Sequence, residues 1–311
     1  MTTVPATRRS TIQATDAGRR RRRGRPAGQA PSEAPANWFT YTVLAVVILI
    51  SAFPLYWSLV LGSSTDVEMS KPVPNLIPGS NLLENVRKVL DPVEAQNVFF
   101  LRSLWNSIIV TVIVTFSVLF FCSMAGFAFA KLRFRGRNAL FLFLVATMTI
   151  PSQVGLVALY ILMGKYHLNG TLWAVILPGL VTAFGVFLMR QYLMDAIPDE
   201  LIEAARVDGA STWRVYLTLV VPSVRPIAGV LGLFTFISTW NDYQWPLITL
   251  KTGSGDTYTI QVALSNLATG VNVDYSRLMA GSLMATIPLL ILFLLAGKQI
   301  VSGIMDGAVK S

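Results

Sequence analysis

The sequence predicts an all-α membrane protein with six transmembrane helices, and three observations lead to this fold class. Hydrophobic residues make up 53% of the chain and charged residues 13%, whereas soluble domains carry about 25% charged residues. Six apolar stretches are long enough to cross about 30 Å of hydrocarbon. None of the six alternates between apolar and polar residues as the strands of a membrane barrel do.

The first 37 residues differ from everything that follows. They hold eight of the 25 basic residues, all arginines before residue 26, and almost no large apolar side chains. Such a segment cannot bury enough surface to offset the entropy lost on ordering. We therefore expect residues 1–37 to form a disordered, Arg-rich cytoplasmic tail. No folded recognition module accompanies it, so no nucleic-acid partner is expected.

The membrane domain is predicted to cover residues 38–311. Its six spans run from Phe39 to Gly62, Leu104 to Ala130, Ala139 to Met163, Leu172 to Leu193, Val224 to Leu250, and Met279 to Ser302. Five of them contain a proline, at positions 54, 151, 178, 246 and 288. Neighbouring helices in a bundle can satisfy the carbonyls that a proline frees, so these prolines do not argue against the spans.

The distribution of basic residues predicts the orientation. With the amino terminus inside, 18 Lys and Arg residues lie in the inside segments and 7 in the outside segments. Cytoplasmic loops carry an excess of Lys and Arg. We expect a multi-pass membrane protein with both termini in the cytoplasm, in contact with lipid along its spans.

A polar segment, residues 195–222, separates the fourth and fifth predicted spans on the cytoplasmic side. Pro198 suits the first turn of a short helix, and the two acidic residues after it favour the positive end of the helix dipole. Gly209 can adopt the positive φ that ends a helix, and Ser211 suits the N-cap of a second helix that runs to Pro222. The segment is therefore expected to form a short amphipathic helix and a turn.

Helical spacing places four residues on one face of this short helix: Leu201, Ala204, Ala205 and Asp208. The alanines allow another backbone to approach closely, and Glu203 at the edge can reach a basic group of a partner. An alternative is a helix that lies on the bilayer, with Glu203 paired to Arg206. Helices on anionic bilayers favour basic polar faces, so we expect a protein partner.

The same segment resembles the EAA loop of binding-protein-dependent ABC importer permeases, which reads E-A-A, three residues, G, nine residues, then I-x-L-P. The matching residues here are Glu203, Ala204, Ala205, Gly209 and Pro222, with Leu219 and Val221 in place of Ile and Leu. The resemblance implies a cytoplasmic coupling helix that fits a groove on the ATP-hydrolysing subunit. It also implies an ion pair between Glu203 and that subunit.

Three further segments are similar to the carbohydrate-uptake branch of these permeases, specifically the maltose-transporter-type six-span second subunit: "AGFAFAKLRFRGRN", "IPSQVGLVALYILMGKYHLNGTLWAVILP" and "WNDYQWPL". The likeness implies a MetI-like ABC importer permease fold in the bacterial inner membrane. The implied partners are a second permease subunit in a heterodimer, two ATPase subunits that hold ATP and Mg, and an extracytoplasmic solute-binding protein. The final segment "GIMDGAVKS" resembles a tail that reaches the ATPase interface, although Asp306 replaces a small residue.

Candidate residues for the substrate pathway lie in the outer half of the fifth span and near two other spans. They are Trp240, Asn241, Asp242, Tyr243, Asn106 and Gln153. Aromatic faces beside hydrogen-bonding side chains suit a sugar. An aromatic belt at the outer interface accounts for the first four residues equally well, and hydrogen bonds between helices account for the last two.

The sequence favours transport over catalysis. It lacks a G-x-x-x-x-G-K-[ST] phosphate loop, and its single cysteine (Cys122) and single histidine (His167) exclude a Cys/His metal cluster supplied by this chain alone. We expect a non-catalytic permease subunit of a sugar importer that binds no cofactor itself and works by alternating access. Two alternatives stay open: the same permease type for a solute such as glycerol phosphate, and a secondary carrier. An intramembrane hydrolase lacks a suitable base.

Overall fold

The computed structural model describes residues 37–311 except 70, 72–74, 96–97, 270–272 and 309–311, and it describes no side chain after Leu295. The predicted disordered tail therefore lies, apart from Asn37, outside the described residues. Contacts divide the chain into two units, residues 1–51 and 52–311. Helix α1 (Trp38–Gly62) begins in the first unit and ends in the second.

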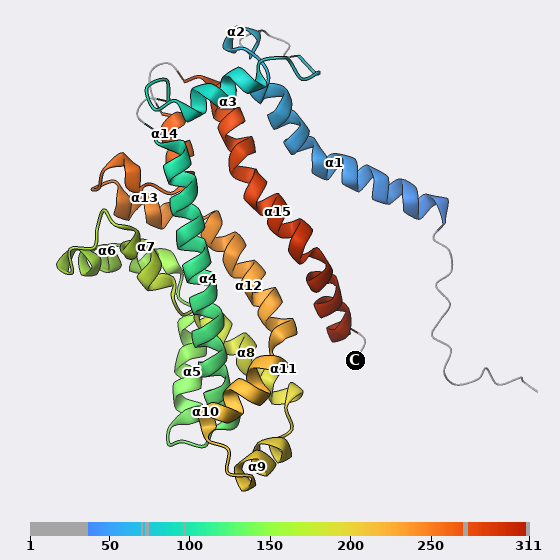
Figure 1. Cartoon of the computed structure of the whole chain (residues 1–311), viewed down its shortest axis with the longest axis vertical. Helices are drawn as coiled ribbons and strands as arrows, with labels where there is room; N and C mark the ends of the chain where they lie inside the picture. The colour runs from blue at the N-terminus through green and yellow to red at the C-terminus, as the bar shows by residue number, and fades with distance from the viewer. Residues whose placement is uncertain (1–36, 70, 72–74, 96–97, 270–272, 309–311) are drawn as a thin grey trace, which may run out of the picture. The chain divides into compact units, whose positions relative to one another are not determined.

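Every regular element in the described residues is helical, which confirms the all-α class (Figure 1). After α1 come α2 (Asp66–Met69), α3 (Leu82–Leu90), α4 (Phe100–Lys131), α5 (Arg137–Thr147), α6 (Leu156–Lys165), α7 (Leu172–Ile176), α8 (Ala183–Ala196), α9 (Asp199–Val207), α10 (Thr212–Val215), α11 (Val221–Ser223), α12 (Arg225–Trp240), α13 (Gln244–Leu250), α14 (Ile260–Leu267) and α15 (Tyr275–Ala308). The described residues also contain three 3₁₀ turns and one π-helical turn. The 3₁₀ turns are η1 (Ser152–Gly155), η2 (Leu177–Gly179) and η4 (Gly255–Thr257), and the π-helical turn is η3 (Tyr216–Val220).

Helix α4 is central to the second unit, where it packs against α8 on one side and α12 on another, while α15 packs against α12 and α3. Two glycines allow α4 and α8 to approach closely. A Cβ atom at Gly126 would lie 2.7 Å from the Cβ of Met189, and one at Gly185 would lie 2.7 Å from the Sγ of Cys122. Small residues at helix contacts are typical of membrane bundles.

The buried residues of the second unit form one large cluster and smaller ones. The large cluster follows α4 from Val110 to Phe127, and α9 joins it through Ile202. A second cluster contains Phe100 and Trp240 and lies where α3, α4, α12, α14 and α15 meet. Helix α9 is therefore anchored in the same core as the middle of α4.

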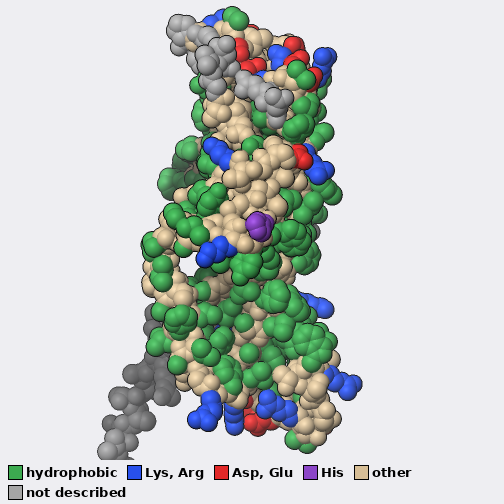
Figure 2. All heavy atoms as spheres, turned by 90° about the vertical axis from the view of Figure 1, so that its left-hand side faces the viewer, with side chains coloured by type: hydrophobic (Ala, Val, Ile, Leu, Met, Phe, Trp, Pro, Cys, Tyr) green, Lys and Arg blue, Asp and Glu red, His purple; other side chains and the backbone are tan. Residues whose placement is uncertain are grey.

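The predicted spans are confirmed in part. Within the part of the chain that the structure describes, four helical segments are long and apolar enough to cross a membrane, and up to six result if two bent pairs each count as one span. The third span bends by 92° between α5 and η1, at Pro151. Figure 2 shows hydrophobic side chains over much of one face, with Lys and Arg gathered at the end where α9 lies in Figure 1.

The prediction of one continuous span from Val224 to Leu250 is wrong. Helix α12 ends at Trp240, and α13 begins as a separate helix at Gln244. The side-chain amide of Asn241 donates to the carbonyl of Ile237 at 2.9 Å, a local bond that competes with continuation of the helix. The bent pair that qualifies as a span lies earlier, at Thr212–Ser223 and Arg225–Trp240, with a 75° bend.

Candidate functional site

The candidate site is built around α9, whose ends are defined by the residues that the sequence indicates. Pro198 immediately precedes the helix, and Asp199 and Glu200 occupy its first turn. At the other end Gly209 has φ of +77°, as predicted. The N–H of Gly209 donates to the carbonyl of Arg206 at 3.0 Å, and that of Ala210 to the carbonyl of Ala205 at 2.9 Å. These two bonds form a Schellman C-cap.

The turn after Gly209 leads directly into α10. Ser211 is the N-cap, as predicted, because its Oγ accepts a hydrogen bond of 3.2 Å from the N–H of Arg214. A Cβ at Gly209 would meet nothing within 4 Å. Glycine is therefore required at this position for its backbone conformation and not for space. The helical segment that begins after Ser211 runs through Pro222 to Ser223, and the chain then bends by 75° before α12.

Helix α9 is attached to the second unit by one side and leaves the other side exposed. Ile202 is buried in the larger core cluster, and Ala205 packs at its edge. The remaining members of the predicted face, Leu201, Ala204 and Asp208, are exposed. Leu201 is 52% exposed and the nearby Val207 is 88% exposed. We call Leu201, Ala204, Val207 and Asp208 the α9 face, an uncovered apolar surface with an acidic end.

An ion pair joins the start of α9 to the end of α4. The Nζ of Lys131 lies 2.8 Å from the Oδ1 of Asp199, and the Lys131 side chain is only 5% exposed. Its hydrogen bond and its charge lower the pKa of Asp199. A carboxyl group whose pKa is lowered in the folded protein is ionised above that pKa and becomes protonated as the pH falls through it. The Lys131–Asp199 ion pair is therefore formed at neutral pH and is lost in acid.

A second, weaker pair joins α9 to the loop between α4 and α5. Arg133 and Glu203 approach to 3.9 Å, with side chains 87% and 65% exposed. Exposed pairs of this kind contribute about 0–1 kcal/mol. The predicted partner of Glu203 belongs to another chain, so this internal contact and the predicted one would exclude each other. The pairing of Glu203 with Arg206 is not among the ion pairs of the described residues.

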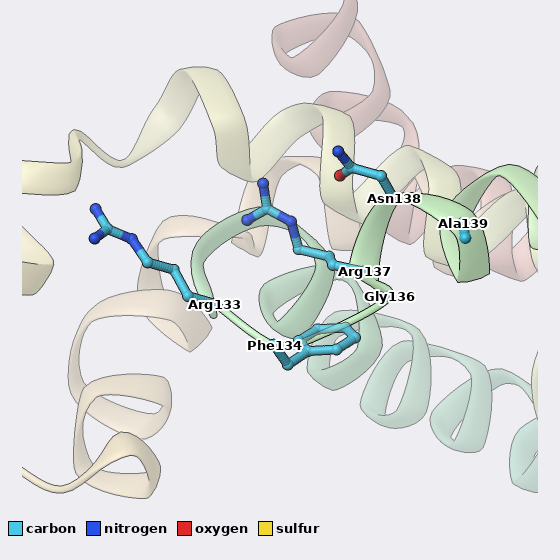
Figure 3. Close-up of a pocket in the computed structure, with 6 residues that line it drawn as sticks. All are labelled: Arg133, Phe134, Gly136, Arg137, Asn138 and Ala139. Carbon is cyan, nitrogen blue, oxygen red and sulfur yellow. The ribbon is translucent and has the colours of Figure 1, made fainter.

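Two hollows flank these ion pairs. One of about 360 Å³ lies over the start of α5, where Figure 3 shows Arg133 and Arg137 extending on one side of the loop and Phe134 on the other. The second hollow, of about 500 Å³, lies between α4, α8 and α9. Its lining residues are Ala130, Lys131, Arg133, Arg137, Met194, Asp199, Ile202, Glu203 and Arg206. This end of the molecule therefore presents a charged groove beside an apolar helix face.

The sequence interpretation missed the role of residues 131–137 in this arrangement. It counted their four basic side chains toward membrane orientation, yet Lys131 and Arg133 contact the helix that follows 66 residues or more along the chain. A signal for this contact was present in the sequence. The acidic start of α9 needs basic partners, and residues 131–138 offer four basic and no acidic side chains.

The predicted pathway residues do not meet in one place. Trp240 is 1% exposed and stacks on Phe236 at 6.0 Å. Asn106 is 3% exposed, and its side-chain amide donates to the carbonyls of Asp256 and Tyr258. In this conformation burial closes both side chains to a solute. The Nε1–H of Trp240 has no hydrogen-bond partner in the described residues, whereas two structural hydrogen bonds account for the amide of Asn106.

The other pathway candidates lie at helix ends. Asn241 and Asp242 form the turn between α12 and α13, and Asp242 accepts weakly from the N–H of Trp245 at 3.5 Å. The hydroxyl of Tyr243 lies 2.8 Å from that of Ser265. Gln153 is exposed in η1. The predicted ATPase contact of residues 303–311 depends on side chains that lie outside the described residues.

Comparisons with known proteins are consistent among themselves. A family model described as "Binding-protein-dependent transport system inner membrane component" matches residues 122–299. The arabinooligosaccharides transport system permease protein AraQ of Halalkalibacterium halodurans is 31% identical over 88% of this chain and 96% of its own length. The lactose transport system permease protein LacG of Rhizobium radiobacter is 32% identical, over 87% of this chain and 95% of its own length.

Two further similarities complete the comparison. The sn-glycerol-3-phosphate transport system permease protein UgpE of Escherichia coli is 30% identical over 86% of this chain and 95% of its own length. A chain from the crystal structure of a bacterial ABC transporter involved in the import of the acidic polysaccharide alginate matches with a TM-score of 0.71. The match covers 84% of this chain and 94% of that chain at 24% identity, which is a likeness of fold.

Proposed function

The chain belongs to the family of inner-membrane components of binding-protein-dependent transport systems, and from this premise we propose that it is a permease subunit of an ABC importer for carbohydrates. The observation that carries the proposal is α9, a short helix that begins after Pro198, ends in the Schellman C-cap at Gly209, is joined to α4 by an ion pair, and is exposed along the α9 face. A free apolar and acidic surface of this kind suits a protein partner. The proposed partner is the ATP-hydrolysing subunit.

The proposed mechanism is alternating access driven from outside the chain. ATP and Mg bind to two partner ATPase subunits, whose closure would push on α9. This chain would transmit the displacement of α9 to its transmembrane helices. Two connections support this role: Ile202 in the core cluster, and Lys131, whose pair with Asp199 leads to α4. Because α4 packs against α8 and α12, a displaced α9 would rock the helices that surround the pathway.

The proposed assembly has three further kinds of partner. A second permease subunit would complete the pathway as a heterodimer, and an extracytoplasmic binding protein would deliver the solute. The α9 end, with Lys131, Arg133 and Arg137 nearby, would face the cytoplasm, as the excess of basic residues at this end favours. Both termini would then also be cytoplasmic.

A carbohydrate is the proposed substrate class, with glycerol phosphate as the second candidate. Two of the relatives are named for sugars, arabinooligosaccharides and lactose, and one for sn-glycerol 3-phosphate. The three relatives are similar in identity and coverage, so the choice needs a feature of this chain itself.

The test is uptake by proteoliposomes that contain this chain, its partner permease, the ATPase subunits and the binding protein. We expect labelled lactose or an arabinose oligosaccharide to enter only with ATP and the binding protein. An ATPase variant that binds but does not hydrolyse ATP is the control. Uptake by the purified chain alone, or without ATP, would contradict the proposal and favour the secondary carrier.

A further inference from the structure

A separate hollow lies within the helix bundle, away from α9. Its volume is about 400 Å³, and α4, α8, η2 and α12 surround it. None of its lining residues is charged. Six of them carry hydroxyl groups or aromatic rings: Thr182, Phe184, Phe234, Thr235, Ser238 and Thr239. We call this hollow the α8–α12 pocket.

The α8–α12 pocket lies near the middle of α4 and at the break that precedes α8, and it extends along the C-terminal part of α12, from Leu231 to Thr239. Val114 lines it from α4, 14 residues after Phe100 and 17 before Lys131. At 1.5 Å per residue these separations are roughly 21 Å and 25 Å along the helix axis. Transporters place their substrate sites near the bilayer midplane, where discontinuous helices supply part of the wall.

The span from Leu172 to Ala196 is discontinuous at the pocket. Residues 180–182 separate η2 from α8 and are not helical, and Thr182 has an extended backbone. Irregular backbone at membrane depth is tolerated where it is buried in protein or lines a water-filled cavity, and not where it faces lipid. Gly179 and Thr182, on either side of the break, both line the pocket. Because both residues border a hollow, the break fits a cavity that water or a solute can enter.

The hydroxyl groups can both donate and accept hydrogen bonds. The Oγ1 of Thr182 accepts from the N–H of Gly185, so its own hydrogen is free to be donated. The hydroxyls of Thr235 and Ser238 donate to backbone carbonyls, and their oxygens remain free to accept. Within the described residues, Thr239 makes no side-chain hydrogen bond. Such a mixture matches a solute that is itself rich in hydroxyls.

The aromatic side chains suit the same kind of solute. Phe234 is 60% exposed and Phe184 is 47% exposed, so both rings present open faces. Flat aromatic faces pack against the apolar CH faces of a sugar ring while hydroxyls bind its rim. A phosphate would find no Lys or Arg among the lining residues. Burying an unpaired anion is costly.

We propose that the α8–α12 pocket is this chain's wall of the solute pathway and that it takes an uncharged sugar ring, with Phe234 stacking on the ring. The inference rests on the proposed function. It places the solute contacts on residues other than Asn106 and Trp240, and it favours carbohydrate over glycerol phosphate.

The first test uses cysteine substitutions in the complete complex in proteoliposomes. The natural Cys122 is fully buried and is the single cysteine of this chain, so the chain without a substitution should not react with a hydrophilic thiol reagent. We compare Phe234→Cys with Phe116→Cys, because Phe116 on α4 is also exposed, at 69%, but lies outside the pocket. We expect a charged methanethiosulfonate to label position 234 readily and position 116 hardly at all.

Solutes then identify the occupant. Transported lactose or arabinose oligosaccharide, supplied with binding protein and ATP, should slow labelling of Phe234→Cys severalfold, and glycerol 3-phosphate should not. Equal labelling at positions 234 and 116, or labelling that the sugar leaves unchanged, would overturn the pocket assignment. Protection by glycerol 3-phosphate as strong as by sugar would overturn the substrate class.

A kinetic arm separates this inference from the proposed function. Phe234→Ala should raise the KM for lactose uptake about three- to tenfold, which corresponds to about 0.65–1.4 kcal/mol, because the contact between the aromatic ring and the sugar is lost, while binding-protein-stimulated ATP hydrolysis persists. Phe116→Ala should change neither value. If wild-type complex imports sugar and Phe234→Ala does so with the same KM, the pocket inference is wrong and the proposed function stands. If wild-type complex imports no sugar, the proposed function itself is wrong.

Discussion

The α9 end and the α8–α12 pocket are built in opposite ways. Around α9 the important groups are charged or exposed: Leu201 and Val207 face outward, and Lys131 and Arg133 pair with acidic residues. The pocket has no charged lining residue, and its walls come from three helices that are distant in sequence. One region is suited to a protein partner that docks from water. The other is suited to a small neutral solute.

This difference indicates how the two tasks are divided within one chain. Helix α9 depends on one buried anchor, Ile202, and one ion pair, Lys131–Asp199. The pocket lies along α4, whose far end carries that same pair. Substitutions at the α9 end should therefore change assembly and coupling without changing solute affinity, and substitutions in the pocket should do the reverse.

The largest effect is expected for Leu201→Asp on the α9 face. The substitution would place an unpaired charge in the docking interface, a change that typically costs 2–5 kcal/mol or more. Copurification of the ATPase subunits with the tagged chain should fall more than about tenfold. Leu83→Asp is the matched control, because Leu83 is 83% exposed on α3, away from α9. An equal loss of ATPase in both variants would remove the distinction between the two regions.

A smaller effect is expected for Gly209→Val. A side chain other than glycine pays roughly 1–2 kcal/mol in the left-handed conformation, and a β-branched one is tolerated least. Because a Cβ here has open space, the whole effect should come from the backbone. Sugar uptake per ATP hydrolysed should fall severalfold. Gly209→Asn, which tolerates this conformation better, should retain most of the coupling, and unchanged coupling in Gly209→Val would contradict the role of the turn.

The smallest effect is expected for the ion pairs. Lys131→Met should lower sugar uptake per ATP hydrolysed. The loss should correspond to a coupling free energy of no more than about 1 kcal/mol, because Asp199 stays largely solvated without its partner. Arg133→Met, which removes the exposed 3.9 Å pair, should have almost no effect. The double substitution Lys131→Asp with Asp199→Lys re-forms the ion pair with its charges exchanged, and it should recover part of the uptake that Lys131→Met loses. A larger effect at Arg133 than at Lys131 would reverse the ranking of the two pairs.

The parts of this structure that the sequence predicted correctly are those determined by near neighbours along the chain. The φ of Gly209, the N-cap of Ser211 and the start of α9 after Pro198 depend on bonds between residues three to five positions apart. Each residue type carries its own signal for such a bond. The six apolar stretches were also visible, because lipid imposes a minimum length on them.

The remaining features depend on contacts that no local pattern reveals. The pair Lys131–Asp199 joins residues 68 positions apart, and the α8–α12 pocket combines residues 114, 179–184 and 231–239. The break after Trp240 was missed because the polar residues Asn241 and Asp242 were interpreted as solute contacts within a span, although Asn and Asp are also typical turn residues. The aromatic cluster there looked like a solute site, but Trp240 is buried against Phe236.

The most direct test of the central claim, that α9 docks to an ATPase in the cytoplasm, is the accessibility of a cysteine at Val207, which is 88% exposed. A membrane-impermeant maleimide should label Val207→Cys in inside-out vesicles stripped of the ATPase, and rebinding of the ATPase should block the reaction. In cells whose outer layers have been removed but whose inner membrane is intact, the same residue should stay unlabelled. Labelling from the outside, or labelling that the bound ATPase leaves unchanged, would contradict the account.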